Sequence, residues 1–436
     1  KMITNKLFIV NNNSIILALL SSAIIGVAIS FSDIYLFHLI LFILTIIWIY
    51  QFKENKYRLN LDIFSDNHSK VLLVVLSWYL LSLLWAPSLV LGLKYMFYLI
   101  CGIIITFSFI YFSKSIEDLN TIFKVLSFFI TIEIIIALAE SFTSFRMPIS
   151  SYSSFAMLFG KDPINFSEFG DIFIYSKISP PTGFHWNTND LAICMIISLP
   201  FFLCSNKSSI KIVGALSITT IIIMTASRAA FLGLILIYSL YLILIKKRIG
   251  TLSLVWIALF IFFLGIQQLR ESENPRINEV ANSIEALTLY LSGEIDVGGS
   301  IQWRRELVDN GINAFYNSYG LGIGAGGSVA NQELIGPVAG RFTSMHNFWV
   351  ELLVEGGIFV GILIFFWLSS IIYNLFIISR TTIDNGLKYY SQSLFLSVTA
   401  FVPAAIAASS TIYFFPMWIM FGFAISVILL SKTPIS

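Results

Sequence analysis

The sequence predicts an all-α integral membrane protein of about twelve transmembrane helices, with a large, partly helical outer loop between spans nine and ten. Composition is the first reason, because 57% of the 436 residues are hydrophobic and only 11% are charged. Soluble domains usually carry about 25% charged residues, so this chain cannot form a water-exposed surface throughout. The mean hydropathy of +0.86 agrees. The other reasons are a series of long apolar stretches and a one-sided distribution of basic residues between them.

A helix needs about 20 apolar residues to cross a bilayer, and stretches of about this length recur along the whole chain. We expect spans at approximately 14–31, 33–52, 70–87, 90–112, 119–141, 189–205, 210–227, 229–246, 251–269, 348–378, 391–413 and 415–432. The tenth stretch is long enough to tilt or to extend beyond the bilayer.

Basic residues orient this set of spans. Lys and Arg gather in the connections on one side, as in Lys246-Lys247-Arg248, whereas the short connections on the other side carry almost none. The positive-inside rule then predicts that both termini are cytoplasmic. Two long loops, at about 142–188 and 270–347, face outward in this arrangement, so we expect one membrane domain over residues 1–436 with an elaborated outer face.

The larger loop contains helical patterns. Apolar residues recur with helical spacing over 277–291, which predicts an amphipathic packing helix, and a second helix is expected from Ser300, a favourable N-cap. The glycine-rich run 320–327 is not followed by the Gly-Lys-Ser/Thr of a nucleotide-binding loop. We interpret it as a turn or a place where two backbones approach closely.

Arg228 is the single charge within a long apolar stretch at about 212–245. An arginine in a bilayer costs several kcal/mol unless it is paired or meets water, so such residues are functional candidates. The alternative is an interfacial arginine that extends its side chain to the headgroups. The predicted orientation places Arg228 at the outer end of two spans.

Further basic residues occur in the larger loop on the same predicted side. Arg304 and Arg305 could form a solvated helix face if taken alone, but with Arg228, Arg341 and His346 they predict an anion-binding site. His346 has an ordinary pKa near 6.5, which suits a group that accepts a proton from a hydroxyl. Glu351 and Glu355 follow on the next helix. They either orient the imidazole, pair with an arginine or face the interior of the bundle.

The smaller loop ends in the segment Pro180 to Asp190, whose Asn and Asp residues favour a helix start. His185 and Asn189 are candidate supporting residues there, although a histidine beside Trp186 is more often structural.

The three cysteines lie in apolar stretches without metal or disulfide spacing, and no basic run with interleaved aromatics predicts nucleic-acid binding. We therefore expect no metal and no cofactor.

Four of these elements, in this order, resemble motifs of the bacterial O-antigen ligase and O-antigen polymerase superfamily. They are the stretch from Gly183 to Asn189, the Ser227-Arg228 junction, Arg304 with Val308 and the trailing Gly322-x-Gly324, and His346-Asn347 with Gly357 eleven residues later. The resemblance covers about residues 180–360 and does not separate ligase from polymerase. The doubled Arg304-Arg305 leaves open which arginine faces the site, and we favour Arg304.

The resemblance implies a GT-C-like glycosyltransferase in the bacterial inner membrane, with its site on the periplasmic face. It implies an undecaprenyl-pyrophosphate-linked oligosaccharide donor, a glycan acceptor, arginines at the pyrophosphate and His346 as base, together with the lipid bilayer and a chain-length regulator as partners. We favour a polymerase, with a ligase that transfers to lipid A-core as the alternative. A flippase is less favoured, since transporters usually place polar sites near the midplane of repeated halves.

Overall fold

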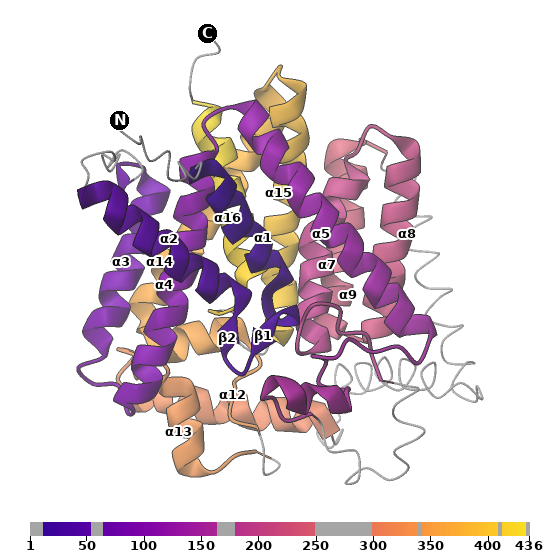
Figure 1. The fold of residues 1–436 in the computed structure, drawn as a ribbon. Coiled ribbons are helices and arrows are strands. Elements are labelled where there is room, and N and C mark those ends of the chain that lie inside the picture. The colour runs from indigo at the N-terminus through magenta and orange to yellow at the C-terminus, as the bar shows by residue number, and fades with distance from the viewer. Residues whose placement is uncertain are drawn as a thin grey trace, which may run out of the picture.

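The computed structural model describes residues 12–53, 64–163, 179–248, 299–338, 342–408 and 412–432. A bundle of long helices carries a smaller layer of short helices across one end (Figure 1). The elements are α1 (Asn12–Ile25), η1 (Gly26–Ala28), β1 (Ser30–Phe31), β2 (Ile34–Tyr35), α2 (Leu36–Lys53), α3 (Asn67–Ser82), α4 (Leu89–Phe112), α5 (Ile116–Phe142), η3 (Ser154–Phe159), α7 (Thr188–Leu203), α8 (Ser208–Thr225), α9 (Arg228–Leu240), η5 (Tyr241–Ile245), α12 (Gly299–Asn317), α13 (Gly327–Ile335), α14 (Phe348–Thr381), α15 (Asn385–Ala404), η7 (Ala405–Ala407) and α16 (Phe415–Leu430).

The described residues confirm a helical membrane protein. Six of their helices are long and apolar enough to cross a bilayer, and four more are shorter and apolar. Every predicted span overlaps a described helix except 251–269, which lies outside the described residues, as does the predicted amphipathic helix at 277–291.

Several predicted boundaries differ from the structure by a few residues, and three of the differences bear on the site. The stretch 33–52 begins in the antiparallel hairpin β1–β2, so its helix starts at Leu36. The helix expected to start with Ser300 as its N-cap already includes Ser300, because the described part of α12 runs from Gly299. The tenth span is broken at Gly357, so its first residues, from Phe348, form a separate short helical segment.

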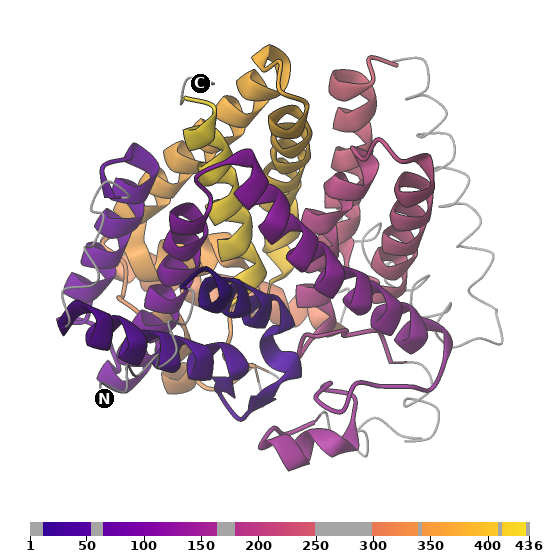
Figure 2. The same cartoon turned by 45° about the horizontal axis from the view of Figure 1, so that its top comes forward.

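Apolar residues on all sides of a helix indicate burial, and two helices show this pattern. Every residue of α16 from Phe415 to Ile428 is buried, and α7 is almost as fully enclosed. α7 packs against α8 and α15, α16 packs against α4, and α14 packs against α15. α5 crosses the bundle between α1 and α8 (Figure 2). Exposed apolar side chains such as Phe42 and Phe365 lie on the outer helices, where a bilayer would cover them.

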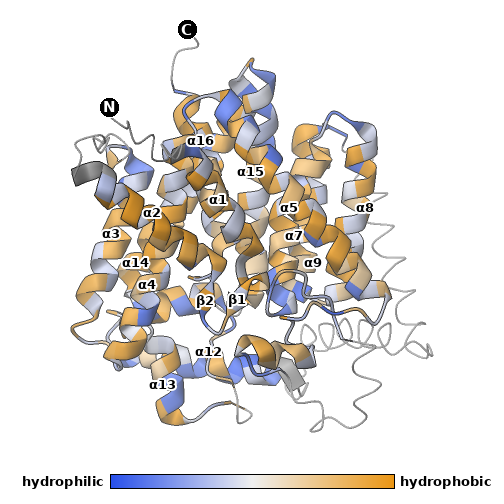
Figure 3. Ribbon diagram, in the orientation of Figure 1, coloured by the Kyte–Doolittle hydropathy of each residue, from blue (hydrophilic) through white to orange (hydrophobic). Residues whose placement is uncertain are grey.

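The two ends of the bundle differ in polarity. The connections α4–α5, α7–α8 and α14–α15 lie at the end opposite α12 and α13 (Figure 1). Two of these connections contain Lys114 and Lys207, and Arg380 is in the last turn of α14. Apolar residues dominate the bundle, whereas α12 and α13 carry many hydrophilic residues (Figure 3). This separation agrees with the charge pattern from which the orientation is predicted.

The break in α14 is the feature on which the layer of short helices rests. Gly357 has φ +72° and ψ −175°, which is not helical, so neighbouring peptide groups lose their partners within the helix. The glycine-rich segment supplies replacements. Ile323 N donates to Val354 O at 2.8 Å, Gly324 N donates to Glu355 O at 3.1 Å, and Ile358 N donates to Gly320 O at 2.9 Å.

Such contacts require glycine, because the two backbones nearly touch. A Cβ on Gly322 would lie 2.5 Å from Gly357 N, and one on Gly324 would lie 2.8 Å from Ser82 O. Both glycines have positive φ, which side-chain-bearing residues rarely adopt. Trp78 Nε1 donates to Gly356 O at 2.8 Å, and Trp85 Nε1 donates to Gly322 O at 3.0 Å. The glycine run is therefore a site of close backbone approach, which was one of the two interpretations of its sequence.

We expect Gly357→Ala to lower the apparent Tm far more than Gly26→Ala. Both positions have positive φ, so each alanine costs about 1–2 kcal/mol in backbone strain. A Cβ at Gly26 would meet nothing within 4 Å, whereas one at Gly357 would overlap Leu321 O. Thermal unfolding of the purified protein in detergent measures the difference. Equal Tm losses for the two variants would contradict the proposed role of the close contact.

Candidate functional site

His346 lies in a short extended segment between α13 and α14. Val338 and Phe342 form an antiparallel bridge at its start, and the segment ends where Asn347 caps α14. The Asn347 side chain accepts hydrogen bonds from Trp349 N at 3.2 Å and Val350 N at 3.3 Å. Asn347 thus fixes the beginning of the helix directly after His346. This gives it a structural function, with no direct contact to a ligand required.

The His346 backbone has φ +49°, an unusual left-handed conformation for a histidine. Its ring meets Phe342 edge to face at 5.8 Å, and Phe342 in turn lies 5.4 Å from Trp303 of α12. The Nδ1 atom is buried and has no hydrogen-bond partner among the described residues. The imidazole is therefore held by aromatic packing and by its backbone, and one of its nitrogens remains available.

α12 places its two arginines in different environments. Arg304 is partly buried, whereas the Arg305 side chain is 57% exposed and lies 3.8 Å from Asp309 one turn later. Leu307 is buried, and Gly311 packs against Met345, so α12 lies directly over the His346 segment. These positions favour Arg304, and not Arg305, as the arginine of the site.

Arg228 is the first residue of α9, directly after the turn that joins α8 to α9. Ala226 in this turn has φ +54°, and Ser227 occupies the N-cap position without making a side-chain cap. The Ser227 hydroxyl is buried and lacks a hydrogen-bond partner among the described residues. A helix N-terminus with free amide groups and a nearby hydroxyl is well suited to bind an anion. The sequence placed Ser227 with Arg228 in a family motif but did not show that the serine hydroxyl is buried.

Electrostatics connect Arg228, Arg304 and His346, although they come from distant parts of the chain. The pKa of Arg304 is lowered to about 10, mainly by burial and to a smaller extent by the charge of Arg228. The pKa of His346 is lowered to about 4, mainly by burial and to a smaller extent by the charge of Arg304. The imidazole is thus neutral at physiological pH, and both guanidinium groups remain charged. Two like charges so close together would be stabilised by a bound anion. Arg341 lies outside the described residues.

The two glutamates of α14 face the interior of the bundle. Glu355 Oε1 accepts a hydrogen bond from Ser328 Oγ at 2.6 Å, which ties the start of α13 to the broken helix. Glu351 is also buried. Glu355 therefore faces the interior, one of the alternatives left open by the sequence, and from there it supports the layer of short helices.

His185 belongs to a different cluster. Its Nε2 lies 3.1 Å from Glu133 Oε1, and Cys194 Sγ donates to Glu133 Oε2 at 3.5 Å. Burial lowers the pKa of His185, and the charge and hydrogen bond of Glu133 raise it. The net shift is upward, which favours an ion pair between the two side chains. These three groups could also hold a metal ion, since their ligand atoms lie within 4.8 Å of one another. Their contacts with one another are a sufficient structural explanation for their burial.

A second buried glutamate holds the loop that carries His185. Glu140 Oε2 accepts from Thr182 N and Gly183 N, both at 2.8 Å, and Glu140 Oε1 accepts from Met147 N at 2.9 Å. α7 then begins with Asn187 as its cap, which accepts from Asp190 N at 3.0 Å and confirms the predicted helix start. Asn189 occupies the first turn, partly exposed, and provides no cap.

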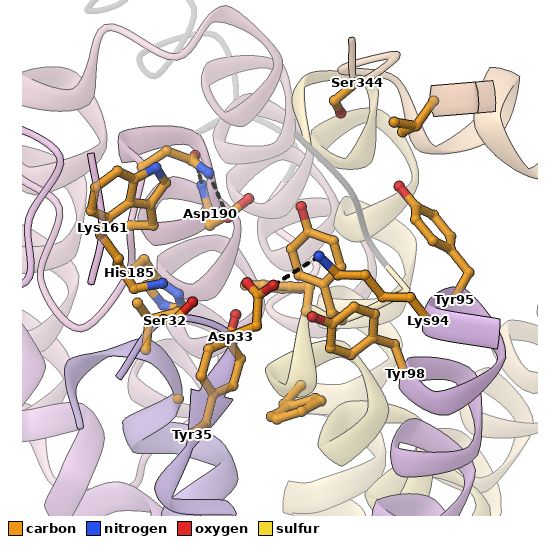
Figure 4. Close-up of a pocket in the computed structure, with 18 of the residues that line it drawn as sticks. Ser32, Asp33, Tyr35, Lys94, Tyr95, Tyr98, Lys161, His185, Asp190 and Ser344 are labelled. Carbon is orange, nitrogen blue, oxygen red and sulfur yellow. Dashed lines mark hydrogen bonds and ion pairs between the residues drawn. The ribbon is translucent and has the colours of Figure 1, made fainter. Parts of the chain in front are cut away.

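Beside the His346 segment lies a cavity of about 490 Å³. Its walls come from the β1–β2 hairpin, α4, the residues after η3, the start of α7, α13 and the turn before α16 (Figure 4). Thr343 and Ser344, a few residues before His346, belong to the same wall. The close-up shows Asp33, Lys94, Lys161 and Asp190 around one space, with Lys94 paired to Asp33.

The sequence model of the O-antigen ligase family matches residues 213–366, a region that contains Arg228, Arg304, His346 and Gly357. The teichuronic acid biosynthesis protein TuaE of Bacillus subtilis is 23% identical over 425 residues, which cover 94% of this chain and 81% of that protein. These two comparisons support the O-antigen ligase/polymerase superfamily that the sequence motifs resemble. They do not distinguish ligase from polymerase.

This superfamily assignment and the structure agree on which parts of the chain matter. The Ser-Arg junction is the start of α9, the Gly-x-Gly element fills the break in α14, and the glycine after His-Asn is the break itself. His185 and Asn189 lie outside the matched residues 213–366, as does most of the cavity wall.

The pKa of His346 provides a direct test of this geometry. We expect His346 to remain neutral at pH 5.5, because burial and Arg304 lower its pKa to about 4. Arg304→Gln removes one of these two causes and should raise the pKa, whereas Arg305→Gln should leave it unchanged. NMR titration of ¹⁵N-histidine-labelled protein measures this pKa. The signal that is missing from the spectrum of His346→Gln identifies His346. An ordinary pKa near 6.5 in the wild-type protein would contradict the described packing.

Proposed function

We propose that the protein is a membrane glycosyltransferase that moves a glycan en bloc from undecaprenyl pyrophosphate to a hydroxyl of a glycan acceptor. The observation that carries this proposal is the convergence of Arg228, Arg304 and a neutral His346. The proposal includes about twelve spans, cytoplasmic termini and a reaction on the outer face of the bacterial cytoplasmic membrane. It requires no metal ion, because the arginines supply the positive charge.

In the proposed reaction, an oxygen of the acceptor hydroxyl attacks the anomeric carbon of the donor glycan. The new glycosidic bond forms as the bond from that carbon to the pyrophosphate oxygen breaks, and the pyrophosphate leaves with the electron pair. His346 takes the hydroxyl proton. Because its pKa lies well below neutral pH, the imidazole starts in the form that can accept this proton.

The leaving pyrophosphate gains negative charge as the bond breaks, and stabilising this charge is the main requirement of the reaction. Arg228 and Arg304 would bind the pyrophosphate oxygens, and the amide groups at the start of α9 with the Ser227 hydroxyl would add neutral donors. Preorganised donors of this kind are worth about 3–4 kcal/mol each when removed singly. We leave Arg305 out of the proposed site because its side chain is exposed.

We favour a polymerase, which transfers the growing chain to the next lipid-linked repeat unit. The biosynthetic assignment of TuaE, to teichuronic acid, supports a role in building a polysaccharide. A ligase is the second candidate, favoured by the description of the matching family as O-antigen ligase. The two share the same donor chemistry and differ in the acceptor.

Deletion of the gene in its host tests the function. A polymerase predicts glycans of a single repeat unit, whereas a ligase predicts lipid-linked polymer that accumulates beside an unmodified acceptor. We expect His346→Ala to reproduce the deletion phenotype at a normal protein level in the membrane, since an alanine cannot take the hydroxyl proton. Gel electrophoresis of the surface polysaccharide reads both outcomes. Near-normal polymer in the His346→Ala strain would rule out the proposed base.

The two arginines of α12 form a matched pair for the pyrophosphate site. We expect Arg304→Gln to reduce transfer about 100- to 1,000-fold, as for loss of one preorganised donor, and Arg305→Gln to reduce it less than about threefold. Initial rates with purified lipid-linked donor in detergent measure the difference. Equal losses for the two variants would contradict the assignment of Arg304, and not Arg305, to the pyrophosphate site.

A further inference from the structure

The cavity beside the His346 segment has the size and lining of a ligand site. Its volume of about 490 Å³ falls within the range of small-molecule pockets, about 300–1,000 Å³. Tyr35, Tyr98 and Trp186 provide aromatic surface, and Asp33 and Asn187 provide polar groups. Flat aromatic rings against the C–H faces of a sugar, with polar groups around its hydroxyls, are the chemistry that carbohydrate recognition requires.

Lys161 is the unusual member of this wall. Its Nζ lies 5.3 Å from the ring centre of Trp186 and 5.6 Å from that of Tyr35, within the range of cation–π contacts. No ion pair to a carboxylate within 4.0 Å is found for it among the described residues. Burial lowers the pKa of Lys161, although nearby Asp33 opposes the shift. The ammonium group is thus partly desolvated without an anion in contact.

The acidic residues of the wall are already engaged or exposed. Asp33 pairs with Lys94 at 2.8 Å, and Asp190 accepts a hydrogen bond from Asn187 Nδ2 at 2.6 Å. Asp162 and Glu333 are exposed, so solvent screens their charges. Lys161 is therefore the cation of this wall without an ion pair to a carboxylate in the described part of the chain, and it lines the cavity.

We propose that the cavity is a subsite for an acidic sugar of the glycan substrate, in which Lys161 binds the sugar carboxylate. This inference rests on the proposed function, because Thr343 and Ser344 connect the cavity wall to His346. A sugar held there contacts the segment that leads to His346. Trp186 and Tyr35 stack on the sugar ring, and the pair Lys94–Asp33 binds its hydroxyls.

An anionic group near Lys161 could also be a phosphate, and the pyrophosphate of the lipid donor is the obvious source. The two sources predict different behaviour. A sugar carboxylate depends on Lys161, whereas a pyrophosphate depends on Arg228 and Arg304. The proposal assigns the carboxylate to Lys161 and the pyrophosphate to the arginines.

The experiment measures binding to the purified full chain in nanodiscs by saturation-transfer NMR and microscale thermophoresis. The probes are a tetrasaccharide of alternating glucuronic acid and N-acetylglucosamine and its carboxyl-reduced, neutral form. We expect the wild-type protein to bind the acidic form about tenfold more tightly, Lys161→Met to lose this preference and Lys161→Arg to keep it. Arg305→Gln, on an exposed surface, serves as the matched control and should bind like the wild type.

Farnesyl pyrophosphate distinguishes the two anion sources. Its affinity should be unchanged in Lys161→Met and reduced in Arg304→Gln. Loss of farnesyl pyrophosphate binding in Lys161→Met would overturn the carboxylate assignment, as would wild-type protein that binds both tetrasaccharides equally or neither of them. Because these assays need no transfer, a negative result beside a polymer-producing wild-type strain would reject the subsite and leave the proposed function intact.

Discussion

The position of the layer of short helices depends on the break of α14 at Gly357. A helix interrupted in this way leaves peptide groups without partners, and their burial would cost about 1–3 kcal/mol each. The segment from Gly320 to Gly324 satisfies these groups, and it can approach because Gly320, Gly322 and Gly324 carry no side chain. The layer of α12 and α13 is thereby attached to the bundle through main-chain contacts. Main-chain contacts fix position more rigidly than exposed side chains would, so α12 is held over His346.

The charges of the candidate site illustrate a second principle, which is that burial and repulsion can prepare a site for its ligand. Arg228 and Arg304 raise each other's free energy in the empty protein, and Arg304 disfavours protonation of His346. A pyrophosphate would relieve the first effect. The fold tolerates this repulsion because Arg228 lies at the start of α9 and Arg304 lies on α12, in the layer of short helices. Both positions are away from the apolar centre of the bundle.

Much of the fold and part of the site could be predicted from the sequence, because both depend on local signals. Hydropathy located the helices, and an isolated charge in an apolar stretch identified Arg228. Local signals could not reveal the break at Gly357, whose partners lie more than thirty residues earlier. They also missed Asn347 as a cap and Ser227 as a buried hydroxyl, since each depends on backbone geometry. Arg341 and the stretch 251–298 fall outside the described residues and stay predictions.

The origin of the cavity walls has an evolutionary consequence. The groups proposed for bond cleavage all lie within the region that the family model matches, residues 213–366, whereas Asp33, Lys94, Lys161 and Trp186 lie before it. Substitutions in the first half of the chain could therefore alter which polysaccharide is built without disturbing the bond-making centre. Such a division would let a lineage diversify its cell-surface coat by drift in one half while purifying selection preserves the other. Exchange of the first half between relatives becomes a practical route to glycans of new composition.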